Sequence, residues 1–180
     1  FDSDVSSLDY ESNKLDRTVI AQKLMGDGFH SRVTQNGEQQ TKDHKVLIFE
    51  NHDTVHFEEG IPSFSFGISD RKKLEKQLRD FIGDMGIDTS TFILDRYEQK
   101  AGGSIQVLFT EEYKDFLVFD NYVEVTLDDR GITSIGCQYK EVRGFLNDSA
   151  RVMPAHQVLL RNFADSDNAV ITAIDLGFKG

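Results

Sequence analysis

Two histidines four residues apart, His52 and His56, come closest in this sequence to a metal site. On a helix such a pair can bind one metal ion, and a glutamate beside the first histidine completes the zinc-peptidase motif. That glutamate is absent, and the surrounding segment is typical of a strand or a tight hairpin. We therefore interpret both histidines as surface residues and expect no metal and no other cofactor.

Adjacent acidic residues offer a second possible chemistry, at Glu58-Glu59, Glu111-Glu112 and Asp128-Asp129. A glycosidase needs two carboxyl groups that face each other across a substrate, one of them with a raised pKa. Neighbours on a strand point to opposite faces, so these pairs are poor catalytic dyads. The stretch 165–168 begins like a calcium loop, but Ala169 stands at the third ligand position.

Glycine-rich turns and one cysteine complete the search for reactive groups. Gly26-Asp27-Gly28 and Gly102-Gly103-Ser104 lack the glycine and lysine that follow in phosphate-binding loops. Cys137 lies in an alternating apolar segment, which predicts a buried and inert thiol. We predict no catalytic residue and therefore no enzyme.

Composition limits the partners of the chain. The 180 residues carry 20 basic and 31 acidic side chains, a net charge of −11. This balance argues against nucleic acid and anionic lipid, because both attract clustered lysine and arginine. No apolar run is long enough for a membrane span. The chain begins at Phe1 with a polar lead, and we expect something to precede it; a juxtamembrane position is one natural explanation.

Three segments carry helical signals. The clearest, from Ser69 to Gly86, has an N-cap residue, a stop glycine and one apolar stripe formed by Leu74, Leu78, Phe81, Ile82 and Met85. A helix near Asn13 carries Leu15, Val19, Ile20, Leu24 and Met25 and ends at Gly26. A third helix is expected from Pro154 onward.

The remaining segments alternate with a period of two. Strands are expected over 45–50, 54–58, 63–68, 91–98, 104–111, 115–127, 132–143 and 169–178. The polar stretch 35–43 is expected to be a mobile loop. The order of elements predicts an α+β fold of two packed lobes, 1–68 and 69–180, each a helix on an antiparallel meander sheet, with a third helix and strand at the C-terminal end.

The chain is rich in phenylalanine, with 14 Phe and no Trp. Core packing of helix-covered sheets explains most of them. The run Phe116-Leu117-Val118-Phe119 leaves open a second interpretation, in which some of these side chains line an exposed groove for another protein.

Three stretches together suggest a known family. These are the hairpin from Tyr122 to Ile135, the helical stretch from Val152 to Leu160 and the strand from Ile171 to Phe178. In their order they resemble the extracytoplasmic part of the YycI family, which regulates the WalK (YycG) sensor histidine kinase of low-GC Gram-positive bacteria. Part of the pattern is also similar to YpmB and PepSY-like modules, which would cover about half of the length.

The resemblance implies a single-pass cell-membrane protein with a transmembrane helix just before Phe1 and this domain on the extracytoplasmic side. It implies binding rather than catalysis: with a YycH-like protein, the domain would repress a WalK/YycG-like sensor histidine kinase. It also implies further strands after Gly180. It transfers no site residue.

Two other functions stay open on the sequence alone. One is a cell-envelope hydrolase that uses acidic residues, and the other is a PepSY-type protease-inhibitory module. An enzyme should have a deep pocket with convergent carboxylates, whereas a regulator should present a shallow groove or an exposed sheet edge.

Overall fold

The chain runs twice through one helix followed by four antiparallel strands. The first set is α1 (Arg17–Met25), β3 (His30–Thr34), β4 (Gly37–Lys42), β5 (Lys45–Glu50) and β6 (Thr54–Glu59). The second is α2 (Arg71–Asp84), β7 (Phe92–Gln99), β8 (Ile105–Tyr113), β9 (Phe116–Leu127) and β10 (Ile132–Gln138). The computed structural model describes residues 4–5, 7–11, 15–35, 37–146, 150–151 and 177–178.

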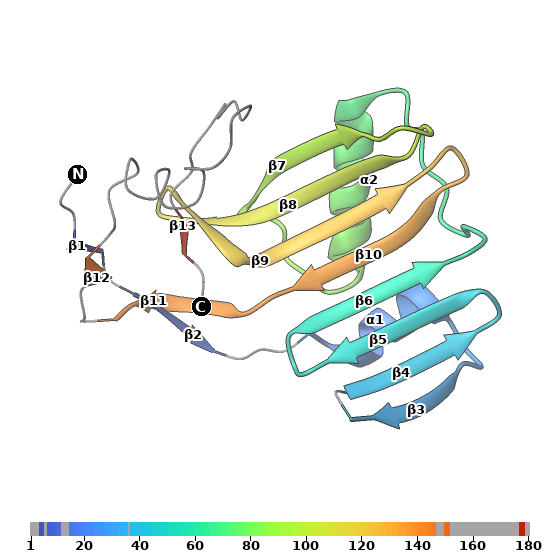
Figure 1. Ribbon diagram of the computed structural model, residues 1–180, viewed down its shortest axis with the longest axis horizontal. Helices are drawn as coiled ribbons and strands as arrows, with labels where there is room; N and C mark the ends of the chain where they lie inside the picture. The colour runs from blue at the N-terminus through green and yellow to red at the C-terminus, as the bar shows by residue number, and fades with distance from the viewer. Residues whose placement is uncertain are drawn as a thin grey trace, which may run out of the picture.

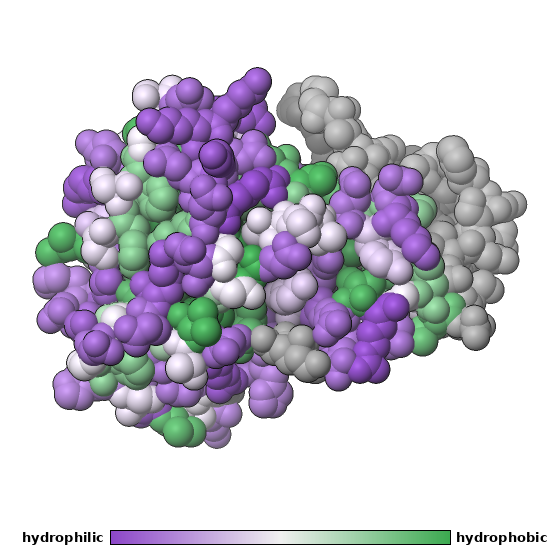
Figure 2. Space-filling model, turned by 180° about the vertical axis from the view of Figure 1, so that it is seen from behind, coloured by the Kyte–Doolittle hydropathy of each residue, from purple (hydrophilic) through white to green (hydrophobic). Residues whose placement is uncertain are grey.

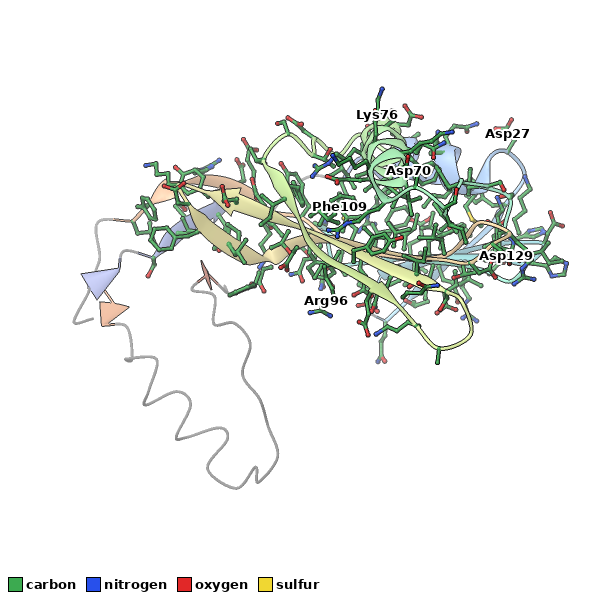
Figure 3. The ribbon with its side chains drawn as sticks, turned by 90° about the horizontal axis from the view of Figure 1, so that it is seen from above. Asp27, Asp70, Lys76, Arg96, Phe109 and Asp129 are labelled. Atoms are coloured by element: carbon green, nitrogen blue, oxygen red, sulfur yellow. The ribbon has the colours of Figure 1, made fainter. Side chains whose placement is uncertain are left out.

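All eight strands form one sheet, in the order β3-β4-β5-β6-β10-β9-β8-β7 (Figure 1). The two sets meet where β6 and β10 pair antiparallel, with Phe57 opposite Ile135. Both helices lie on the same face of this sheet (Figures 1 and 3). The α+β class is confirmed, but the prediction of two helix-on-sheet lobes is wrong.

The physical reason for the single sheet is that each meander would otherwise end in an unpaired strand. Pairing β6 with β10 satisfies the hydrogen-bonding groups of both edges and joins two small cores into one. The position of the change from one set to the other, between residues 68 and 69, stays a prediction.

Short strands extend the structure beyond the main sheet. β2 (Leu8–Glu11) pairs with β11 (Glu141–Phe145), and β1 (Asp4–Val5) pairs with β12 (Ala150–Arg151). β13 (Gly177–Phe178) joins β9 in parallel. The helix expected from Pro154 lies outside the described residues, as does the strand over 169–178 except for β13.

Helix α2 forms because its sequence supplies both a cap and an apolar stripe. Asp70 is the N-cap, and its carboxylate accepts hydrogen bonds from the N–H groups of Lys72 and Lys73. The helix ends at Asp84, and Gly86 follows with a φ of 83°. The whole predicted stripe is buried: Leu74, Leu78, Phe81, Ile82 and Met85.

Helix α1 is shorter than the sequence suggests. It begins after Asp16, whose side chain caps Thr18 and Val19, rather than near Asn13. Ile20, Leu24 and Met25 are buried as predicted. Val19 is 39% exposed, because a nine-residue helix presents only one narrow face to the sheet.

Two loop and strand predictions are wrong. The stretch 63–68 contains no strand: Phe64 and Phe66 pack edge-on against Phe81, and the stretch makes single hydrogen bonds to the β9–β10 turn. The stretch 35–43, predicted to be a loop, contains β4, which is paired on both sides. Among the described residues, no helix is long and apolar enough to cross a membrane.

Candidate functional site

Of the helices that the structure describes, both lie on one face of the main sheet, and we call the opposite face the open face. It consists of the side chains that alternate with the core residues along each strand. A row of cross-strand neighbours runs across it from β3 to β7: Arg32, Gln39, Ile48, His56, Gly136, Glu124, Leu108 and Arg96. Figure 3 shows the contrast, since Phe109 points toward α2 and Arg96 away from it.

The open face is mixed in character. Val46, Ile48, Leu108 and Tyr122 are half-buried, so an apolar component lies among polar side chains. Carboxylates outnumber guanidinium groups, which occur at the two ends of the central row. The acidic residues are Glu50, Glu58, Asp95, Glu98 and Glu124, and the basic ones are Arg32 and Arg96.

Local contacts hold several of these side chains. Thr110 donates a hydrogen bond to Asp95, which occupies a bulge of β7. His56 Nε2 lies 3.8 Å from a carboxylate oxygen of Glu50. Burial raises the pKa of Tyr122, and nearby Cys137, Glu124 and Asp120 raise it further. Tyr122 therefore stays a neutral hydrogen-bonding group on this face.

A shallow cavity of about 350 Å³ lies at the β3–β4 end of the sheet. The described residues that line it include no carboxylate and are His30, Ser31, Arg32, Gln39 and Thr41. The Arg32 guanidinium donates a hydrogen bond to the side-chain carbonyl of Gln39 at 2.8 Å. Arg32 therefore gives this cavity a local positive charge on an acidic protein.

The two histidines of the possible metal site lie in different environments. His52 is exposed in the turn between β5 and β6, and His56 is half-buried on the open face. Within the described part of the chain, no group of three or more metal-binding side chains converges. Zinc chemistry needs at least three such ligands.

Two of the three acidic pairs divide between inside and outside, as the strand geometry predicts. Glu58 is exposed and Glu59 is buried beside Lys45, at 3.5 Å. Glu112 is exposed, whereas Glu111 is buried. Because the members of a pair face opposite ways, neither pair forms a dyad.

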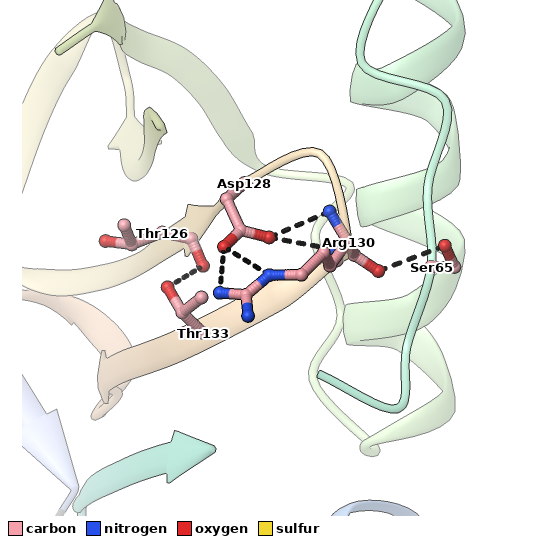
Figure 4. A network of polar contacts seen from close by, with 6 residues as sticks. Ser65, Thr126, Asp128, Arg130 and Thr133 are labelled. Atoms are coloured by element: carbon pink, nitrogen blue, oxygen red, sulfur yellow. Dashed lines mark hydrogen bonds and ion pairs between the residues drawn. The ribbon is translucent and has the colours of Figure 1, made fainter. Parts of the chain in front are cut away.

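The third acidic pair belongs to a turn. Asp128 accepts hydrogen bonds from the N–H groups of Arg130 and Gly131 and from the Arg130 guanidinium (Figure 4). These bonds lower the pKa of Asp128. Ser65 donates to the carbonyl of Arg130, which fastens the 63–68 stretch to this hairpin. The arrangement is structural.

The remaining motifs also have structural roles. Cys137 is fully buried, and burial raises the pKa of its thiol to about 12. Gly26 ends α1 with a φ of 63°, and Gly102 and Gly103 form the β7–β8 turn. In the run from Phe116 to Phe119, only Phe119 is largely exposed, at 40%. The cavity lies instead at β3–β4.

Sequence reasoning missed a buried polar junction where β9 bends. Asn121 is fully buried, and its amide exchanges hydrogen bonds with the main chain of Lys140, at 2.7 and 2.8 Å. It also donates to Glu111, which accepts a second bond from Thr91. The side chain thus continues the ladder where β10 ends. In the sequence, the only sign of this junction is the amide side chain of Asn121 within a largely apolar strand.

A second polar group of the junction is Tyr10. Its hydroxyl is buried without a hydrogen-bond partner among the described residues, and burial raises its pKa, with added repulsion from Asp120 and Glu111. Lys140 balances the acidic charge, at 3.8 Å from Asp120 and over the Tyr10 ring. The junction therefore binds the β2–β11 ribbon to the main sheet.

The helix-bearing face differs from the open face. Figure 2 shows hydrophilic side chains over most of the described part of this face, with apolar side chains in small separate patches. Small scattered patches are normal for a protein surface.

No family model and no curated protein matches this chain. Among solved structures, it is similar to an uncharacterized protein from Eubacterium rectale ATCC 33656, with a TM-score of 0.52 and 8% sequence identity. The match covers 89% of this chain and 66% of that chain, so the chain spans slightly less than two thirds of its length. At this identity the likeness establishes the fold alone.

Proposed function

We propose that this domain regulates by binding other proteins through the open face of its sheet. The observation that carries the proposal is a continuous eight-stranded face, opposite the two described helices, on which apolar and charged side chains are interspersed. Such a mixture is typical of non-obligate protein interfaces. Among the described residues, no group of three or more histidine, cysteine, aspartate or glutamate side chains could hold a metal ion, and the residues that line the β3–β4 cavity include no carboxylate.

The likeness of the sequence to the YycI family suggests the identity of the partners. We propose a single-pass cell-membrane protein whose extracytoplasmic domain, with a YycH-like protein, holds down a WalK/YycG-like sensor histidine kinase. Anchoring on one bilayer raises the effective concentration of the partners. A face of modest apolarity is then sufficient for regulation even where the free domain binds weakly.

The test uses the full-length protein in the organism that encodes it. Ile48→Arg and Glu124→Lys alter the open face, and Lys76→Glu alters an exposed residue on α2 that points away from the sheet (Figure 3). We expect the two open-face variants to change expression of the kinase's target genes as deletion of the domain does. Lys76→Glu should leave expression unchanged.

A strain without the kinase provides the second control. The effects of the open-face variants should disappear there, because the proposed output passes through the kinase. Effects that persist without the kinase, or wild-type expression from well-folded open-face variants, would contradict the proposal. Hydrolysis of cell-wall material by the purified domain would favour the enzyme alternative.

A further inference from the structure

The two edges of the main sheet differ in how they are protected. β7 contains a bulge at Asp95, and bulges disrupt the regular row of hydrogen-bonding groups along an edge. β3 has an unbroken register with β4, from His30 opposite Thr41 to Thr34 opposite Gly37. Figure 1 shows β3 at the outer border of the sheet. Of the two edge strands, β3 is therefore the one with the regular geometry that an additional strand needs for pairing.

The side chains of β3 confirm that it is open. Its first four residues are exposed, and Val33 is 85% exposed. The strand contains neither proline nor lysine, which commonly protect edges. In a hairpin joined by two residues, the flanking pair Thr34 and Gly37 face each other as a hydrogen-bonded pair. Ser31 and Val33 therefore direct their N–H and C=O groups away from β4.

Charge indicates what β3 binds. The cavity beside it is lined by His30, Arg32 and uncharged polar residues. Arg130 and Arg143 pair with Asp128 and Glu11, whereas Arg32 has no ion pair among the described residues and donates only to the neutral Gln39. Glu38 on the neighbouring strand faces the other side, where it binds Ser31 and Gln40.

A second copy of this chain fits the edge poorly. Antiparallel pairing of two β3 strands about their central residue would place two Arg32 side chains directly opposite each other. Like charges in that position destabilise a strand pair. A different strand with an acidic residue at the facing position would gain an ion pair instead.

We propose that β3 receives an extended segment of another protein, which adds to the sheet as a further strand and places a carboxylate against Arg32. Main-chain hydrogen bonds to β3 supply the affinity, and Arg32 with the adjoining cavity supplies the preference for acid. This deepens the proposed function by naming the chemistry of the partner, and it rests on that function only for the partner's identity.

The test is NMR titration of the 15N-labelled 180-residue chain with two peptides. Both have seven residues that alternate threonine and valine, with glutamate at the centre of one and lysine at the centre of the other. We expect the glutamate peptide to shift amides of β3 and β4, and to bind at least fivefold more tightly than the lysine peptide. Shifts confined to β7 or to the open face would overturn the proposal.

Two variants separate charge from backbone pairing. Arg32→Glu should reverse the preference, so that the lysine peptide binds more tightly. Val33→Pro removes an outward N–H and should abolish binding of both peptides, whereas Val33→Thr keeps that N–H and should bind normally. Equal affinity for the two peptides, or dimerisation of the free chain through β3, would reject the assignment of an acidic partner strand.

Because Arg32→Glu alters only an exposed side chain, its result stands even if Val33→Pro fails to fold. The peptide titration and the gene-expression assay fail independently. Loss of peptide binding would remove strand addition and leave regulation by the open face intact. Peptide binding without any effect on the kinase would remove the regulatory function and leave the edge site intact.

Discussion

The two sets of helix and strands share a layout but hold their helices in different ways. In the first, Lys45 from β5 and Lys42 from β4 donate to the carbonyls of Leu24 and Met25, at 2.9 and 3.0 Å, at the end of α1. In the second, Arg79 of α2 itself donates to the carbonyls of Thr89 and Phe92. Cations at a helix C-terminus also interact favourably with its dipole.

The difference shows how one layout can hold two helices whose apolar faces differ in size. α1 has nine residues and α2 has fourteen. The shorter helix buries less apolar surface, and lysines from the strands supplement that burial with directional bonds. The longer helix is held mainly by its stripe. The first set therefore depends more on polar contacts and the second more on the apolar core.

The largest effect is expected from Leu78→Asp in α2. Leu78 is fully buried, and an unpaired carboxylate in that apolar interface costs several kcal/mol, roughly 4–5. We expect loss of cooperative thermal unfolding in circular dichroism. The neighbouring exposed position supplies the control, because Lys76→Asp should unfold near the wild-type temperature. A cooperative Leu78→Asp variant would mean that α2 does not anchor the second set.

The next largest effect is expected from Gly131→Ala, which should lower the free energy of unfolding by roughly 3 kcal/mol. A Cβ at Gly131 would stand 2.1 Å from the carbonyl oxygen of Phe64, and its φ is +146°. The main chain of the β9–β10 turn or of the 63–68 stretch would have to move. Gly83→Ala in α2 meets open space at an ordinary φ and should be neutral or slightly stabilising. Denaturant titration of both variants would measure the contrast.

Lys45→Met tests the polar fastening of the first set. It removes the hydrogen bond to the carbonyl of Leu24 and leaves the buried carboxylate of Glu59 beside methionine in place of lysine. The second oxygen of that carboxylate already lacks a partner among the described residues. We expect a loss of about 2–3 kcal/mol. Adding Glu59→Gln should recover part of it. If the double variant were less stable than Lys45→Met, the buried ion pair would not explain the loss.

From the buried thiol of Cys137 we expect a smaller effect, in which the free energy of unfolding depends on pH. Burial raises the pKa of this acid to about 12, with repulsion from Asp53 adding to it, so the folded state keeps the thiol neutral. Above the unfolded pKa of about 8.5 the thiol ionises in the unfolded state but stays neutral in the folded state. The free energy of unfolding is therefore at its full value below this pH and falls as the pH rises toward 12. At pH 10 the loss should be about 1–2 kcal/mol. Cys137→Val should have a shallower pH dependence between pH 8.5 and 10; equal slopes would contradict this.

The sequence predicts the elements whose signal is local and apolar. The stripe of α2 and the strand Lys45–Glu50 follow from side-chain periodicity, and both are confirmed. β4 escapes this reasoning because polar side chains pair across it: Ser31 and Gln40 both donate to Glu38, which lowers the pKa of that carboxyl group. A strand held in this way has no apolar alternation to detect.

Long-range pairing explains the other failures. Phe64 and Phe66 alternate as a strand would, yet they pack on Phe81. The nearby strand β10 already pairs with β6 and β9, so the 63–68 stretch finds no free strand edge there. The open face has no sequence motif, since its members come from eight strands and become neighbours only through the registers of the sheet. Its recognition required the pairing of β6 with β10.

The most direct test of protein binding by the open face is photocrosslinking in living cells. A photoreactive amino acid replaces His56 on the open face in one strain of the full-length protein and Lys76 on α2 in another. We predict crosslinks to a membrane-anchored partner protein from position 56 and none from position 76. Crosslinks from position 76 alone would contradict the account.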